Sequence, residues 1–194
     1  MKILSLGVIA LASLVATAAA AQSNGPANPG PVIPGVCVYY NARLLAQSTA
    51  GQAVQARMQQ LTQEVQGELT PYGTAIQSEA QALQTSGSSL PAAEAQQRRA
   101  ALQARVTEAQ QLEQTREAEL RYTLAQQRGA ISQAVEPILV ALYQERGCGL
   151  LLDRESVFMM NPAMDLTDVA IQRLNVSLPT LSFNRLPVPA QPQQ

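Results

Sequence analysis

Apolar residues recur every three or four positions through most of residues 48–146, except at residues 113–119, where Ala118 is the only apolar residue. In the first half of this stretch the pattern repeats after 11 residues, as the spacing of Val54, Val65 and Ile76 shows. Eleven residues over three turns is about 3.67 residues per turn, close to an unstrained α-helix. The pattern predicts a long, nearly straight helix over residues 48–84, with Pro71 inside it as a source of a kink.

A second helix of the same kind is predicted over residues 90–146. Residues 85–89 interrupt the pattern, and Ser89 is suited to cap the helix that follows. Leu120, Ile131 and Leu142 are again 11 residues apart, and Pro137 lies inside this helix. A short loop between two long helices predicts an antiparallel hairpin, which projects because it is too long to fold into a globule.

Shorter segments on either side of the hairpin are predicted to form its base. Residues 36–40, 149–153 and 157–160 are typical of strands, with a turn at residues 154–156 between the last two. A short helix over residues 166–174 follows a cap at Asp165. We therefore predict an α+β fold, in which residues 35–47 and 147–175 form a small β body and residues 48–146 form a long coiled-coil arm.

The two ends of the chain differ in composition from the rest. Residues 1–21 have a basic start, an apolar run and an Ala-x-Ala site, which predict a secretory signal peptide cleaved after about Ala21. The alternative, a retained membrane anchor, needs about 20 apolar residues, and this run is shorter. Residues 22–34, rich in Pro and Gly, are expected to form a flexible lead-in, and the Pro-rich residues 176–194 a disordered tail.

Composition restricts the chemistry that the chain can perform. The 194 residues include no His and no Trp, and only 4% are aromatic. The absence of His excludes His-based catalysis and the usual zinc sites. A cluster of Asp153, Glu155, Asp165 and Asp168 could hold a cation, but it lacks the alternating oxygen ligands of a calcium loop, so structural roles are the simpler interpretation. We expect no enzyme activity, no cofactor and no metal.

The charge balance is close to neutral and contains almost no lysine. Lys2 is the only lysine among 13 basic residues, so the exported chain would carry 12 arginines against 14 acidic residues. The arginines are scattered, apart from Arg98 and Arg99, which is unlike a nucleic-acid-binding surface. We expect no nucleic-acid partner.

Two cysteines, Cys37 and Cys148, are present. An oxidising compartment permits one disulfide between them, which would close a loop of about 110 residues. Two buried, unpaired thiols that pack as small apolar side chains are the alternative.

Several short motifs, in this order and spacing, resemble the Skp/OmpH-like family of periplasmic chaperones. Residues 44–53, LLAQSTAGQA, are similar to the family's Leu…Ser-x-x-Gly segment at the start of its first long helix. Residues 145–153, ERGCGLLLD, resemble its Gly-x-x-Leu-x-Leu-Asp strand. The run from Asp165 to Asp168 and the pair Leu174-Asn175 resemble its Asp-x-Thr cap and closing Leu-Asn. The resemblance covers about residues 33–175.

This resemblance implies an ATP-independent holdase that binds unfolded outer-membrane β-barrel proteins in the periplasm. Family members form homotrimers through the β body, and their three hairpins surround a cavity like tentacles. The apolar residues of the β body then form either a trimer interface or the core of a monomer; a body this small favours the interface. The candidates are Val36, Val38, Leu150, Leu152, Val157 and Met159.

The apolar stripe of the first long helix has two interpretations. It could contact clients, or it could form the seam between the two helices. The candidate client-contact residues are Met58, Leu61, Leu69, Tyr72, Ile76 and Leu83.

One departure from the family concerns charge. Well-known members have lysine-rich arms, whereas Arg98, Arg99 and Arg105 are the only modest basic group on this arm. The charge balance therefore does not favour direct binding to membranes or lipopolysaccharide. A different class of function is a structural coiled-coil spacer of the envelope, or an adaptor for one folded partner.

Overall fold

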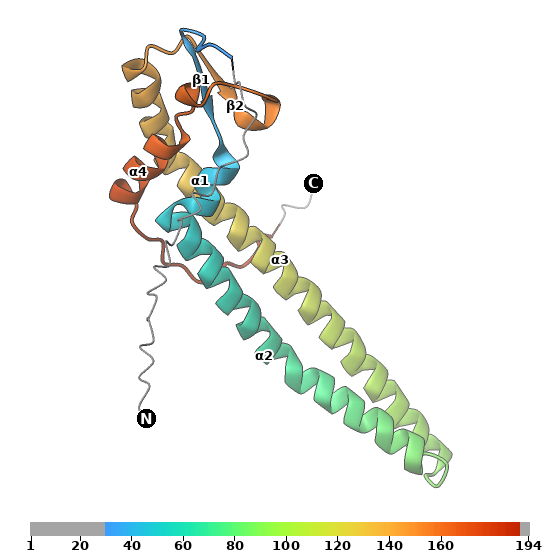
Figure 1. Cartoon of the computed structure of the whole chain (residues 1–194). Helices are drawn as coiled ribbons and strands as arrows, with labels where there is room; N and C mark the ends of the chain where they lie inside the picture. The colour runs from blue at the N-terminus through green and yellow to red at the C-terminus, as the bar shows by residue number, and fades with distance from the viewer. Residues whose placement is uncertain (1–29, 191–194) are drawn as a thin grey trace, which may run out of the picture.

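The computed structural model describes residues 30–190. The predicted signal peptide, residues 22–29 of the lead-in and residues 191–194 lie outside the described residues. Two long helices form an arm that projects from a base made by both ends of the described chain (Figure 1). In chain order the elements are β1 (Val36–Tyr39), α1 (Asn41–Gln47), α2 (Thr49–Ser86), α3 (Ala92–Glu145), β2 (Leu150–Asp153) and α4 (Thr167–Ser177).

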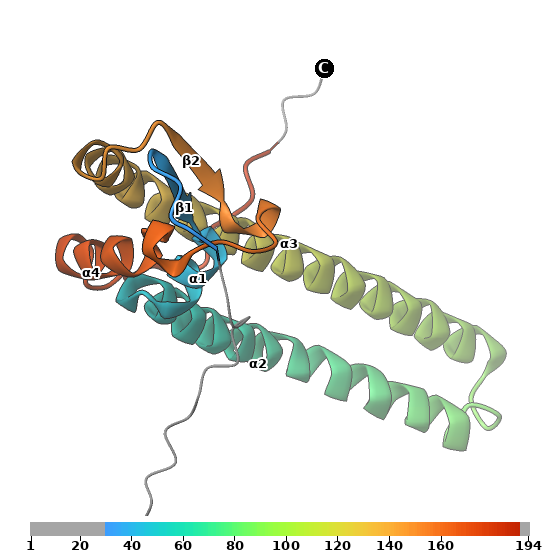
Figure 2. The same cartoon turned by 45° about the horizontal axis from the view of Figure 1, so that its top comes forward.

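Helices α2 and α3 run antiparallel and form the predicted hairpin, as both views show (Figures 1 and 2). Their ends lie within two residues of the predicted ones, and Pro71 and Pro137 lie inside continuous helices. The predicted cap at Ser89 is wrong. Helix α3 begins after Pro91, and the Ser89 hydroxyl donates to the Ser86 carbonyl at 2.8 Å instead of accepting from the helix.

A sharp turn between α1 and α2 explains the Ser-x-x-Gly motif. The Ser48 hydroxyl accepts a hydrogen bond from the Gly51 backbone N–H at 3.1 Å and caps α2. A Cβ atom on Gly51 would lie 1.9 Å from the Leu45 carbonyl oxygen. Only glycine fits this position, because any side chain would collide with the backbone of α1.

The base contains a two-stranded parallel sheet, with Val36 opposite Leu150 and Tyr39 opposite Asp153. The other edge of β1 is also bonded, since the Leu166 N–H donates to the Val38 carbonyl at 2.8 Å. The predicted strand at residues 157–160 is wrong. Residues Arg154–Ser156 form a 3₁₀ turn that does not bring the chain back along β2, so no ladder forms there.

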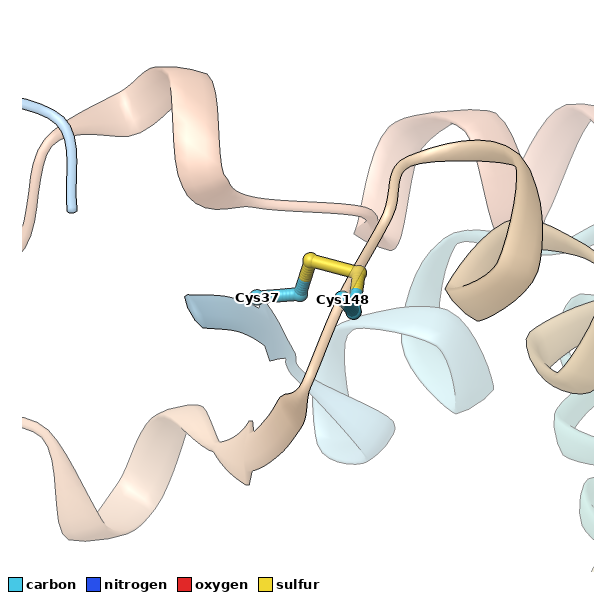
Figure 3. Close-up of a disulfide and its surroundings, with 2 residues drawn as sticks. All are labelled: Cys37 and Cys148. Atoms are coloured by element: carbon cyan, nitrogen blue, oxygen red, sulfur yellow. A yellow bond between two sulfur atoms is a disulfide. The ribbon is translucent and has the colours of Figure 1, made fainter. Parts of the chain in front are cut away.

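A disulfide joins Cys37 in β1 to Cys148, which follows α3 (Figure 3). Their Cα atoms are 5.8 Å apart and 111 positions apart in the sequence. The entire hairpin therefore lies within one covalent loop, and the disulfide belongs to an apolar core to which all four helices contribute side chains.

Helix α4 is attached to the base by polar contacts. The Thr167 hydroxyl accepts from the Tyr40 N–H at 2.9 Å, and Arg43 of α1 pairs with both Asp165 and Asp168. The predicted N-cap at Asp165 is one position too early, since Leu166 is the N-cap residue of α4; the Asp165 carboxylate still accepts from the Thr167 N–H at 2.8 Å.

Asp165 and Asp168, two of the four carboxylates in the candidate cation cluster, thus make structural contacts. A third, Asp153, accepts from the Glu155 N–H at 2.9 Å. Among residues 30–190, no group of three or more His, Cys, Asp or Glu side chains is arranged to hold a metal ion. None of the helices in this part of the chain is both long and apolar enough to cross a bilayer.

The prediction of a disordered tail is wrong for residues 176–190. Residues 176 and 177 belong to α4, and residues 178–190, which we call the strap, cross the arm from the α2 side to the α3 side (Figure 1). Leu178, Leu181 and Phe183 pack against the core of the base. These apolar contacts, together with hydrogen bonds to both helices, hold a segment whose composition alone favours disorder.

Candidate functional site

The arm is packed differently near the base and near its tip. We call residues 49–65 and 119–145 the proximal arm, and residues 66–86 and 92–118 the distal arm. In the proximal arm, Leu61 and Ile131 are each 1% exposed, and Val54, Val65 and Val135 are also buried. In the distal arm, which the structure describes completely, Ala95 near the tip is the one buried apolar side chain. The same sequence pattern thus gives a closed seam in one half and an open one in the other.

The open seam carries shallow pockets lined by apolar and polar side chains. Leu69, Tyr72 and Ile76 of α2 line a pocket of about 230 Å³ together with Val106 of α3. Tyr72 and Ile76 also line a neighbouring pocket of about 370 Å³ that includes Arg105 and Glu108. The distal arm therefore offers half-buried apolar surface beside charged groups of both signs.

The six candidate client-contact residues lie in different parts of the arm. Leu61 is buried in the proximal seam, and Met58 packs against the core of the base. Leu69, Tyr72 and Ile76 come together at the distal pockets, whereas Leu83 is half-buried closer to the tip. Leu61 has no surface available for another molecule, whereas Met58 is half-buried like the last four.

Four charged side chains lie where the proximal arm meets the distal arm. Arg116 of α3 contacts Glu68 of α2 at 2.7 Å and Glu119 of its own helix at 3.0 Å. Arg185 of the strap contacts Glu68 at 2.9 Å and Glu119 at 3.0 Å. Both carboxylates are therefore shared between α3 and the strap, and the cluster joins all three segments.

This cluster changes the acidity of one carboxyl group. The pKa of Glu68 lies below its usual value, because the hydrogen bond from Arg185, supported by Arg116, outweighs the desolvation of the carboxylate. Glu68 therefore stays ionised while the strap is in place. The ionised carboxylate in turn favours the bound position of Arg185.

Two further contacts bind the strap through its backbone. The Arg57 guanidinium donates to the Phe183 carbonyl oxygen at 3.1 Å. The Leu186 N–H donates to the Thr123 hydroxyl at 2.8 Å, and Thr123 itself is fully buried in the arm. The arm thus holds an extended segment partly by groups that any polypeptide backbone possesses.

The candidate trimer-interface residues of the base differ in their exposure. Val38 is 1% exposed because β1 is bonded on both edges, so it has no surface to offer a partner. Leu150 is 49% exposed and Met159 is also exposed. Val36, Leu152 and Val157 are half-buried. The second edge of β2 pairs with no strand in the described chain, which leaves its backbone groups open.

The comparisons with known proteins bear on the whole of this architecture. A family model for OmpH-like outer membrane proteins matches residues 35–174, which include the base and the complete arm. The chain belongs to the OmpH-like family. A search of curated proteins finds no match to it.

One solved OmpH-like structure is similar over nearly its whole length. It is the crystal structure of a protein from Caulobacter crescentus CB15 described as an OmpH-like outer membrane chaperone. The two chains are 35% identical with a TM-score of 0.75, over 82% of this chain and 94% of that chain. The predicted family and the predicted fold, a helical hairpin on a small β base, are confirmed.

Sequence reasoning missed two features of this OmpH-like chain. The first is the apolar surface that Val140 and Phe158 add to the base; Phe158 is 93% exposed. The run Ile-Leu-Val-Ala-Leu at residues 138–142 is too wide for one helix face and could have indicated it. The second is the strap, whose alternating apolar and polar residues from Leu181 to Asn184 were the available signal.

Proposed function

We propose that this chain is an ATP-independent holdase chaperone of the periplasm that binds unfolded outer-membrane β-barrel proteins. The observation that carries the proposal is the open seam of the distal arm, found in a chain of the OmpH-like family. Weak apolar contacts spread along an arm suit a client that has no fixed shape, because many of them add up through their high local concentration.

A homotrimer would place three arms around one cavity. Support comes from the open edge of β2 and from the exposed Leu150, Phe158 and Met159 beside it in the sequence. An unpaired strand edge next to exposed apolar side chains favours pairing with another chain. A pocket of about 460 Å³ lined by Leu139, Val140 and Leu151 extends this apolar surface onto α3.

The arm itself supplies the contacts in this proposal. Tyr72 and Ile76 present apolar surface at the distal pockets, and Arg105 and Glu108 beside them offer weak polar contacts. No nucleotide takes part, since binding and release depend only on competition between client contacts and client folding. The chain acts as a binding protein and not as an enzyme.

The test is suppression of aggregation by the purified mature chain. An unfolded outer-membrane β-barrel protein is diluted out of urea without ATP, and light scattering is recorded at increasing chaperone-to-client ratios. We expect scattering to fall. Replacing Tyr72 and Ile76 by Ser should raise the ratio needed by about three- to tenfold, because apolar client contacts are lost.

The matched control replaces the neighbouring, exposed Thr70 and Thr74 by Ser and should behave like the unmodified chain. No suppression by the unmodified chain at severalfold excess would contradict the proposal. Recovery of a single folded envelope protein by affinity capture, together with that result, would support the spacer or adaptor instead.

A further inference from the structure

The strap has the burial pattern of a β-strand lying on a surface. From Leu181 to Arg185, residues alternate between half-buried and exposed: Leu181, Phe183 and Arg185 are half-buried, and Ser182 and Asn184 are exposed. In an extended chain, side chains at i and i+2 point the same way. The arm therefore contacts every second side chain of this extended segment.

Two of the contacts that hold the strap are hydrogen bonds to its backbone, which any polypeptide segment can make. Arg57 and Thr123 bind its backbone, at the Phe183 carbonyl and the Leu186 N–H. The additional contact from Arg57 to Asn184 reaches a side-chain oxygen at 3.3 Å. An extended segment of another protein presents the same carbonyl and N–H groups, so these two anchors do not depend on the strap's own sequence.

The part of the site that discriminates between side chains of the bound segment consists of two carboxylates. Glu68 and Glu119 receive the guanidinium of Arg185, two positions after the aromatic side chain of Phe183. The fit is incomplete, because the Nη1 atom of Arg185 is buried and has no hydrogen-bond partner among the described residues. A buried donor without a partner weakens the strap's hold. Such a segment is easier to displace than a fully satisfied structural element.

From these observations we infer that the arm, where its proximal half meets its distal half, contains a binding site for extended polypeptide segments, and that the strap occupies this site in cis. The preferred segment carries an apolar or aromatic side chain and, two positions later, an arginine. Segments of transmembrane β-strands are extended and present every second side chain on one face, as the strap does. The inference rests on the holdase function proposed above for its choice of client, whereas the site itself is defined by the strap.

The strap, when bound, lowers the apparent affinity of the site for segments of other molecules. While it occupies the site, only the open fraction of molecules can bind another segment, and apparent affinity falls by that fraction. A short client segment is then excluded, and a long unfolded chain that already contacts the distal arm competes through its own high local concentration. The strap thereby favours long unfolded clients over short peptides.

The test opens the site by reversing one charge in the full-length chain. Arg185→Glu places a carboxylate against Glu68 and Glu119 and should release the strap. The matched control is Arg121→Glu, which makes the same charge change on an exposed side chain that pairs with Glu117 along α3. Hydrogen exchange of residues 178–190 reports release, and we expect it to rise only in Arg185→Glu.

Binding is measured with a fluorescent peptide that copies residues 178–190. If the strap is closed in about nine molecules of ten, its release raises the affinity for the peptide about tenfold. We expect that gain in Arg185→Glu and none in Arg121→Glu. A peptide in which the residues at positions 183 and 184 are exchanged breaks the alternation and should bind poorly to every variant.

Two results would overturn the inference. Unchanged exchange of the strap in Arg185→Glu means that the two carboxylates do not define the site. A released strap without a gain in peptide binding means that the strap is only a structural clamp between α2 and α3.

A last experiment adds an unfolded outer-membrane β-barrel protein as a competitor for the labelled peptide. Displacement is expected. Peptide binding without displacement, in a chain that suppresses aggregation, contradicts the client assignment but not the holdase function. Peptide binding without any suppression of aggregation contradicts the holdase function and leaves the strap site standing.

Discussion

The proximal and distal halves of the arm are built from the same two helices, and the apolar spacing of α2 runs through both, yet only one half has a closed core. In the proximal arm α1, α4 and the strap cover the helix pair, and Leu61 and Ile131 are buried there. In the distal arm, Leu69 and Ile76 remain half-buried. Two helices alone cannot enclose an apolar stripe, so a third covering element decides which half is core and which half is available surface.

The largest effect should come from opening the disulfide, which ties the base together. Replacing Cys37 and Cys148 by Ser removes a cross-link across 111 positions. In the chain-entropy model a loop of this size contributes about 4 to 5 kcal/mol to the free energy of unfolding. Urea unfolding followed by circular dichroism, at one protein concentration, measures the loss. A variant as stable as the unmodified oxidised chain would show that the base does not depend on this cross-link.

The packing contrast can be tested with one substitution made in each half. Leu61→Ala should lower the free energy of unfolding by about 3 kcal/mol, because it leaves a cavity in a closed seam. Leu69→Ala should cost about 1 kcal/mol, since its side chain is already partly in water. Urea unfolding of both variants gives the difference. Equal losses would mean that the distal seam is as closed as the proximal one.

A second pair of substitutions compares two glycines of α2. Gly51→Ala should lower the free energy of unfolding by about 2 kcal/mol, because the new Cβ meets the Leu45 carbonyl oxygen. Gly73→Ala should raise it by about 0.5 to 1 kcal/mol, since nothing lies within 4 Å and alanine favours the helix. Thermal unfolding of the two variants gives opposite shifts in Tm. A destabilised Gly73→Ala would show that the distal arm is more tightly packed than described.

The smallest effect is the response of the strap to acid. The folded-state pKa of Glu68 is lowered from its ordinary 4.5, so its contribution to strap binding is complete above that value. It is lost as the pH falls through the lowered pKa. The anisotropy of a dye coupled to the C-terminus should therefore fall as the pH is lowered below 4.5. Arg185→Gln should show low anisotropy already at pH 7, and a pH response equal to that of the unmodified chain would contradict the role of this pair.

The long helices were predictable because an 11-residue repeat signals a helix whatever surrounds it. The covering of the proximal arm by α1, α4 and the strap was not predictable, because it depends on contacts between segments that are distant in the sequence. Val38 was expected at an interface, but β1 is bonded on both edges and buries it. The strap was expected to be disordered because it is rich in proline. Its hold depends on Arg57, Glu68 and Thr123, which lie far away in the sequence.

The most direct test of the account is to locate the client on the chain. Hydrogen exchange of the full-length protein is recorded with and without an equimolar unfolded outer-membrane β-barrel protein. The account predicts increased protection in the distal arm, residues 66–86 and 92–118, with the core of the base unchanged. Protection confined to the base, or no change in the distal arm while the client is bound, would contradict it.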